Sequence, residues 1–171
     1  MLRLAAAGLA LAAFAANPAY GQETQIVNLA AFAATANSQG TQTAYLDAVA
    51  SIKAGHHDCP YCVLAGADLA NTCVKGGNLR GADFDNARLV LMCMSFADFR
   101  GATFRRADLS GANLASADLD GADLTGANMT ITSIKGADLT HVRGLTQKQL
   151  DAACGDTDTK VPSGMKVQTC S

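Results

Sequence analysis

The segment HHDCPYC, residues 56–62, contains the residue types that carry thiol redox and metal chemistry. Cys59 and Cys62 have the spacing of redox sites, in which the first Cys is a thiolate at a helix N-terminus after a strand. No strand–helix–strand pattern surrounds this segment. A zinc site built from His56 and His57 with the two cysteines would need to close a tetrahedron within seven residues, and no second Cys/His pair follows. We therefore expect a structural disulfide here, with a thiol-redox or metal-binding protein as an alternative.

The N-terminal residues determine how the cysteines are interpreted. Arg3 precedes an apolar run from Leu4 to Ala16, which Pro18 ends, and small residues lead up to Gly21. The run is too short to span a bilayer. The pattern predicts a secretory signal peptide over residues 1–21, cleaved after Gly21, and hence a periplasmic or secreted protein with no membrane insertion.

Six cysteines follow the predicted cleavage site, an even number in an oxidising compartment, so disulfides are expected. Their spacing alone leaves 15 complete pairings open. The candidates are Cys59, Cys62, Cys73, Cys93, Cys154 and Cys170.

Asp and Asn recur with apolar residues at a period of five residues. From Leu64 to Leu139 every fifth residue is Leu, Phe, Met, Val or Ile, with Asp or Asn usually one residue before it and Ala two before it. Five residues advance a helix by roughly 140° and place alternate residues of a strand on opposite faces, so neither element buries this pattern on one side. Repetition at a fixed period is typical of a solenoid of stacked units.

The repeated unit, A-[DN]-[LF]-x-[xG], closely resembles the pentapeptide-repeat family over about residues 62–140. The resemblance implies an all-β solenoid, a right-handed quadrilateral β-helix with one pentapeptide per side and about four coils. It also implies that the central residue and the small residue two before it face the axis, while Gly relaxes the corners. Met92 stands in a small-residue position and predicts a local bulge or a widened coil.

Two short helices are expected to cover the ends of the solenoid, because open ends expose apolar layers and unpaired edges. The expected organisation has an N-terminal segment with a capping helix over residues 22–58, the β-helix over 59–144, and a capping helix with a disulfide-tied tail over 145–171. The first helix is predicted to begin at Thr41 or Thr43, to end at Gly55, and to bury one face, made of Tyr45, Leu46, Val49 and Ile52.

The second helix carries a capping box, Thr146 with Gln149 three residues on. Leu145 and Leu150 are placed to form its hydrophobic staple, and Gly155 is expected to end it.

The coil length implied by the family limits the cysteine pairing. Cys73 and Cys93 are twenty residues apart, one full coil, so both should project outward on adjacent turns. Cys154 ends the second helix and its pairing with Cys170 would fix the tail over the cap. Cys59 and Cys62 then remain for each other.

Nothing in the pattern indicates an enzyme or a cofactor. In this family the Asp positions lie on the outer wall, where they bond locally or to a stacked neighbour. Asp98, Asp118 and Asp138 should stack on one face, with Arg80 and Arg100 softening their repulsion. We find no Ser/His/Asp set and no phosphate-binding Gly loop. A filled rod also leaves no cleft.

The sequence therefore favours a non-catalytic scaffold or protein-binding module with an unknown protein partner, present as a monomer or homodimer. Val90, Leu91 and Phe96 take outward positions and are a possible partner patch. The alternative is that a bulge or the N-terminal segment covers them.

The quinolone-resistance members of the family suggest a second function, in which an acidic rod mimics DNA and binds gyrase. A signal peptide would remove the protein from gyrase. Residues 59–146 also hold nine Asp and eight Lys or Arg, so dense negative rows are absent. We also expect no nucleic-acid partner, because a formal net charge of −2 gives no global field that attracts nucleic acid.

Overall fold

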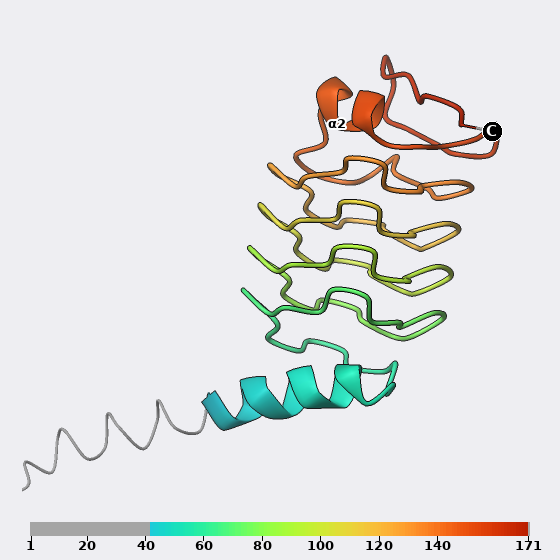
Figure 1. The fold of residues 1–171 in the computed structure, drawn as a ribbon. Coiled ribbons are helices and arrows are strands. Elements are labelled where there is room, and N and C mark those ends of the chain that lie inside the picture. The colour runs from blue at the N-terminus through green and yellow to red at the C-terminus, as the bar shows by residue number, and fades with distance from the viewer. Residues whose placement is uncertain (1–41, 171) are drawn as a thin grey trace, which may run out of the picture.

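The computed structural model describes residues 42–170, which wind into a rod of stacked coils with a helix at each end (Figure 1). Helical residues 42–53 lie at the base of the rod, and helix α2, Gln147–Ala152, lies at the top. Parallel bridges join residues twenty apart, from Val63 with Asp83 to Asp118 with Asp138. This register is the one that four pentapeptides per coil require. The predicted signal peptide lies outside the described residues.

The wall of the rod contains isolated bridges and, within residues 42–170, no continuous strand. Each bridge occupies the residue directly before a central position, because the chain turns again within the next few residues. The rod is therefore a solenoid of single extended positions, whereas the sequence predicted an all-β class built from strands.

Most backbone N–H groups of a pentapeptide find acceptors in its own turns or in the adjacent coils. In the unit 107–111, the N–H of Ala107 closes the turn on the Phe104 carbonyl (3.1 Å), and the N–H of Ser110 donates to the Asp108 carboxylate (3.1 Å). The other three N–H groups donate to carbonyls of the coils below and above, at 2.9 Å each. This unit thus leaves no donor without an acceptor. In units without Asp or Asn before the central residue, such as those of Lys75, Ser95 and Lys135, the N–H after the central residue has no acceptor among the described residues.

The Asp or Asn before each central residue forms an Asx turn, in which its side chain accepts from the N–H two residues on. The bonds are 2.9–3.3 Å long and occur at all ten Asp and Asn positions of the repeat. These residues are Asp68, Asn78, Asp83, Asp98, Asp108, Asn113, Asp118, Asp123, Asn128 and Asp138. The carboxylates of the repeat are therefore turn-forming groups.

The interior is filled by the sixteen central side chains, none of which is more than 1% exposed. The rings of Phe84 and Phe104 stack with centroids 5.1 Å apart, and Phe99 meets both edge-on. Met92 is fully buried in its small-residue position. The predicted bulge is wrong, because the bridges on either side of Met92 keep the twenty-residue register. Its unbranched side chain fits between the small residues Thr72 and Ala112 of the adjacent coils.

The corners of the coils have left-handed backbone. Every fifth residue from Tyr61 to Gly136 has a φ between +54° and +71°, and only half of these sixteen residues are Gly. Two large corner residues, Tyr61 and Leu91, lie against a Gly one coil further on. A Cβ added at Gly111, for example, would lie 2.7 Å from Leu91 Cδ2. Gly adopts this turn without strain, and at Gly111 it also leaves the space that Leu91 occupies.

The N-terminal helix packs on the first coil through a face that differs from the predicted one. Ile52 is buried, and Tyr45, Ala48 and Val49 are partly buried against the core. Leu46 is 55% exposed and does not belong to this face. Leu46 lies on the solvent side of the helix, although Val49 one turn later lies on the buried side. The prediction that all four residues form one buried face is therefore wrong.

The ends of this helix follow the sequence in part. Gly55 has φ +87° and its N–H donates to the Ile52 carbonyl, which ends the helix as predicted. Thr43 lies inside the helix and is not its N-cap. Thr41, the other expected N-cap, lies outside the described residues.

The capping box of α2 is confirmed, since Thr146 and Gln149 bond reciprocally, and Leu145 and Leu150 are both buried. The expected end of α2 at Gly155 is wrong. The helix ends at Ala152, with Ala153 as an extended C-cap.

Gly155 lies in a bridge with Thr169, where an added Cβ would contact the Val167 and Thr159 side chains. The tail then continues the wall, through bridges of Ser133 with Cys154 and of Asp138 with Lys160. The coil above residue 144 is thus formed by the segment predicted as a tail.

Gln149 closes the upper end of the rod. Its side-chain amide is buried and donates to the carbonyls of Leu124 (2.7 Å) and Ala127 (3.0 Å). In the coil below, the equivalent carbonyl of Ala107 accepts from the backbone of Asn128. The amide of Gln149 therefore replaces a donor that a further coil would supply.

We predict that Gly111→Ala destabilises the rod more than Gly101→Ala. Both positions have φ near +67°, so each change should cost about 1–2 kcal/mol of unfolding free energy. Gly101 has open space around it, whereas Gly111 is covered by Leu91. In a Leu91→Ala background the two changes should cost the same, as measured by denaturant unfolding. Equal costs in the native background would contradict the contact.

We also predict that Gln149→Glu destabilises the protein by about 1–3 kcal/mol at pH 7, because Glu keeps the capping box but cannot donate to the two carbonyls. Thermal unfolding measures the change. Lys148→Glu on the exposed side of α2 serves as the control for added negative charge, and an equal loss there would refute the role of the amide.

Candidate protein-binding face

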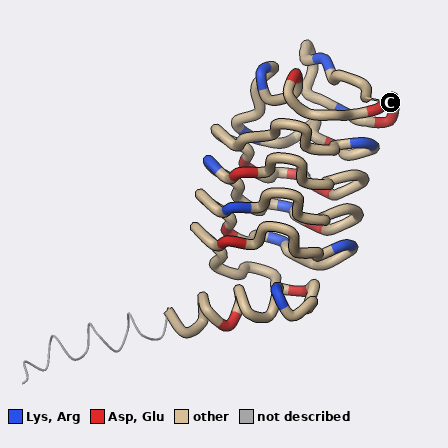
Figure 2. Tube along the Cα trace, in the orientation of Figure 1, with Lys and Arg blue, Asp and Glu red and all other residues tan. Residues whose placement is uncertain are grey.

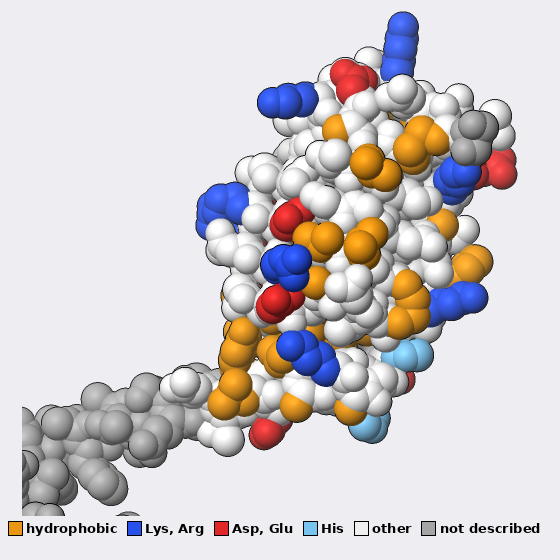
Figure 3. Space-filling model, viewed as in Figure 1, with side chains coloured by type: hydrophobic (Ala, Val, Ile, Leu, Met, Phe, Trp, Pro, Cys, Tyr) orange, Lys and Arg blue, Asp and Glu red, His pale blue; other side chains and the backbone are white. Residues whose placement is uncertain are grey.

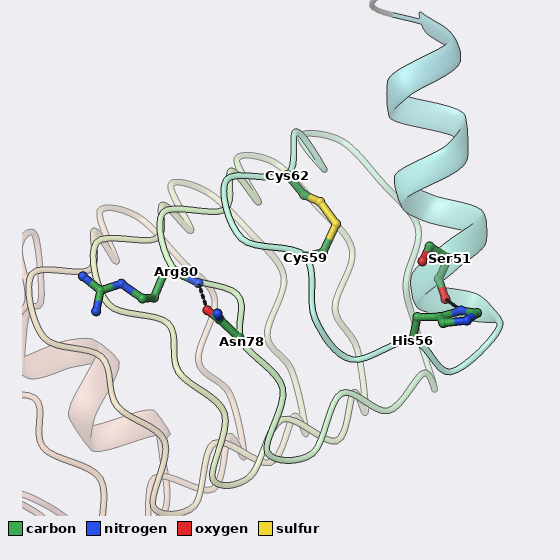
Figure 4. Close-up of a disulfide and its surroundings, with 6 residues drawn as sticks. All are labelled: Ser51, His56, Cys59, Cys62, Asn78 and Arg80. Carbon is green, nitrogen blue, oxygen red and sulfur yellow. Dashed lines mark hydrogen bonds between the residues drawn. A yellow bond between two sulfur atoms is a disulfide. The ribbon is translucent and has the colours of Figure 1, made fainter.

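The CPYC segment is built into the first coil. Cys59 takes the central position one coil before Leu79, and its N–H donates to the Asn78 carbonyl (2.8 Å). Cys59 and Cys62 form a disulfide with Cα atoms 5.5 Å apart, facing the helix at the base of the rod (Figure 4). The segment follows the helix and does not precede one, so it lacks the helix N-terminus that activates a redox thiolate.

The histidines beside this disulfide are exposed, and the backbone of His57 lies so close to Gly77 that no Cβ would fit there. His56 Nδ1 lies 3.3 Å from the Ser51 carbonyl. Among residues 42–170, no three His, Cys, Asp or Glu side chains come together as a metal site would require. The geometry thus assigns the HHDCPYC segment to the first coil and its cap.

The structure brings the other four cysteines together in the pairs expected from the coil length. Cys73 and Cys93 stack on the outer wall with Cα atoms 4.5 Å apart. Cys154 and Cys170 join the tail to the end of α2 with Cα atoms 5.3 Å apart.

Within residues 42–170, five Asp residues of the wall form ion pairs with Lys or Arg, and acidic and basic residues are interspersed along the rod (Figure 2). Arg100 bridges Asp98 and Asp118 on the face where the sequence placed the stacked Asp column. Arg80 is close enough to lower the pKa of Asp98, after the larger effect of the Arg100 hydrogen bond. Further ion pairs are Arg88 with Asp68, Arg105 with Asp85, and Lys160 with Asp138.

One depression of about 470 Å³ lies on this acidic side, between Arg100, Asp118, Asp138 and His141. His141 Nδ1 is 2.9 Å from Asp120. Ser116 also lines the depression, and its hydroxyl makes no hydrogen bond to His141 or to any carboxylate of the described residues that could activate it.

A different face of the rod carries no acidic residue in four successive coils. It consists of residues 72–76, 92–96, 112–116 and 132–136, and we call it the Cys73–Cys93 face. Its only charged side chains are Lys75 and Lys135, and neither has an ion-pair partner within residues 42–170. The Lys75 ammonium lies 5.5 Å from the Phe96 ring centroid.

Large apolar side chains border this face at both corners. Phe96 is 61% exposed at one corner, and Leu91 and Ile131 are 60% and 71% exposed at the other. Of the predicted patch, Leu91 and Phe96 are thus exposed, whereas Val90 is half-buried. No bulge covers them. Residues 22–41 of the N-terminal segment lie outside the described residues. Figure 3 shows such hydrophobic side chains exposed along the rod.

Ile131 was missed by the sequence analysis. Its signal was available, because it lies forty residues, or two coils, after Leu91 at the same corner position. In the sequence TITSI, residues 130–134, the periodicity indicates a buried role for Ile134 and none for Ile131.

The apolar corner residues stand where backbone geometry favours Gly. Leu91, Phe96 and Ile131 have φ of +57°, +61° and +57°. A left-handed backbone costs an ordinary residue roughly 1–2 kcal/mol, and β-branched residues such as Ile adopt it rarely. These side chains gain little burial in return. Costly conformations that bring no packing benefit are typical of functional surfaces.

These features define a right-handed β-helix solenoid with an apolar, acid-free face. Eight copies of a family model described as pentapeptide repeats match the chain, over residues 62–106, 93–130 and 107–143. The chain belongs to the pentapeptide-repeat family, as its sequence indicated.

Solved structures of this family resemble the rod. HetL, involved in heterocyst differentiation regulation in the cyanobacterium Nostoc sp. strain PCC 7120, is 26% identical with a TM-score of 0.51, over 65% of this chain and 51% of HetL. The alr5209 protein of Nostoc is 25% identical with a TM-score of 0.44, over 66% of this chain and 91% of that one.

The quinolone-resistance protein QnrB1 is 17% identical with a TM-score of 0.31, over 65% of this chain and 62% of QnrB1. This chain spans about half the length of HetL. No curated protein sequence matches it. Within residues 42–170, no helix has the length and apolar character needed to cross a bilayer.

The hydrogen bonds of Asp138 and its ion pair with Lys160 predict a loss of stability in acid. Hydrogen bonds from the Thr140 side chain and backbone, and from Lys160, lower the pKa of Asp138 from 3.8 to about 2. Because the folded-state pKa is lowered, this stabilisation is present above about pH 4 and is lost as the pH falls towards 2. We expect Asp138→Asn to flatten the decline of thermal stability over this range. Asp47→Asn, on the exposed side of the first helix, should leave it unchanged, and an equal effect there would contradict the assignment.

Proposed function

We propose that this protein is an exported, non-catalytic scaffold that binds another protein through the Cys73–Cys93 face and its apolar corners. The observation that carries the proposal is the exposure of Leu91, Phe96 and Ile131 at positive-φ corners beside a face without carboxylates. Exposed apolar clusters of this kind mark interaction sites on otherwise polar surfaces.

The filled interior supports a function carried by the outer surface. Sixteen buried central side chains and the small residues beside them occupy the axis along the whole rod. A rigid wall of stacked coils also holds its outward side chains in fixed positions, so that little entropy is lost when a partner binds.

Binding to gyrase by DNA mimicry is not favoured. The carboxylates of the rod alternate with the arginines that pair with them, and the Cys73–Cys93 face has only positive charge. The signal peptide predicted from residues 1–21 also argues for a location away from gyrase.

Site-specific photo-crosslinking in the native host tests the proposed function. We expect a photo-reactive residue at position 96 or 91 to give a discrete adduct with one other protein. Val63, which is apolar and 59% exposed on the opposite wall of the first coil, is the matched control position and should give none. Equal adducts at all three positions, or none at 91 and 96, would refute a binding site at this face.

The same cells test the export. Mass spectrometry of the isolated protein should find Gln22 as the first residue in the extracytoplasmic fraction. A chain that retains Met1 in the cytosol would refute it.

A further inference from the structure

We propose that the Cys73–Cys93 face binds an extended protein segment in which apolar side chains are flanked by carboxylates. The inference rests on the proposed function, and specifies the chemistry of the partner.

The charge of this face favours an acidic partner. The remaining walls of the rod contain all nine of its Asp residues, so their fields are mixed or negative. On the Cys73–Cys93 face, Lys75 and Lys135 have no carboxylate near enough for an ion pair among the described residues. The nearest tail carboxylate at its upper edge, Asp156, accepts hydrogen bonds from Gly136 (2.9 Å) and Thr159 (2.9 Å). A partner that offers carboxylates would complete this face.

The spacing of the two lysines sets the shape of the partner. They occupy the same position in coils that are sixty residues, or three turns, apart. At the spacing of stacked strands this is about 14 Å along the rod. An extended chain covers the same distance in about four residues, so carboxylates four residues apart would reach both ammonium groups.

The apolar corners complete the site between these charges. Leu91 and Ile131 stand two coils apart, about 10 Å, on one edge of the face. Gly111, the corner residue between Leu91 and Ile131, has no side chain, and the Leu91 side chain packs over it. Phe96 stands on the opposite edge beside Lys75. A partner segment that lies on this face, parallel to the rod axis, would thus have apolar side chains in contact with both edges of the face.

A second copy of this chain and a lipid surface fit less well. An isologous contact through this face would bring the lysines of both copies together without a carboxylate. Recognition of an anionic lipid surface uses clusters of about four to eight basic residues, whereas this face has two.

The test is panning of the full mature chain against a phage-displayed library of random linear 12-residue peptides. We expect enriched peptides to combine Leu, Ile or aromatic residues with Asp or Glu about four positions apart. A representative synthetic peptide should bind about tenfold more weakly to Lys75→Glu/Lys135→Glu, and its affinity should fall with rising salt. Lys148→Glu/Lys166→Glu, on α2 and the tail, carries the same charge change and should bind as the native chain does.

The outcomes separate this proposal from the proposed function. Binding lost in Leu91→Ser/Phe96→Ser but unchanged in Lys75→Glu/Lys135→Glu would retain the interaction face and overturn the acidic partner. Enrichment of basic or neutral peptides, or of none, would overturn it as well. A dimer in sedimentation experiments that Leu91→Ser/Phe96→Ser abolishes would assign the face to a second copy. Co-sedimentation with vesicles containing 30% phosphatidylglycerol would assign it to lipid.

Discussion

The structure depends on one constraint, that a unit of only five residues must find acceptors for most of its backbone hydrogen-bond donors in its own turns and in the adjacent coils. Three of the five N–H groups are satisfied by the neighbouring coils and one by the preceding turn. The fifth requires an acceptor side chain at a fixed place, which the Asp or Asn before the central residue supplies in an Asx turn. Without this local bond the chain could turn a corner only by leaving a donor to solvent. The sequence signature therefore follows from backbone chemistry, and the apolar core follows from the coil that the turns close.

The same constraint governs the ends of the rod, where no further coil offers partners. At the base, Asp58 accepts from the N–H of Asn78 (2.8 Å), and at the top Asp156 accepts from that of Gly136 (2.9 Å). Gln149 supplies donors to the last inward carbonyls. Polar side chains thus replace backbone groups at each point where the repetition stops. The helices contribute the apolar cover, through Ile52 at one end and Leu150 at the other.

What the sequence predicted well is what the repetition and the family resemblance determine. The central residues follow from the period of five, and the coil length and the stacking of Cys73 on Cys93 follow from the resemblance to the pentapeptide-repeat family. The errors lie where the chain leaves the period. Leu46 and the end of α2 depend on how a short helix docks on an irregular end, which no periodicity records. Met92 was misjudged for a different reason, since the volume available in a coil depends on residues twenty positions away. Ile131 was missed because its corner position was not followed along its own column.

The position of the proposed binding face can be understood from which residues of each unit are free to vary in type. In each unit the inward residues are fixed by packing and the Asp or Asn by the turn, so only the two residues after the centre can vary widely. Eight of the sixteen corner positions carry residues other than Gly. One of them, Arg106, bonds to Asn86 at the same corner of the coil below. Leu91, Phe96 and Ile131 make no such bond and border the wall that has no carboxylates. Since the fold requires none of these features, a demand from outside the rod explains them best, and contact with a partner is a demand of that kind.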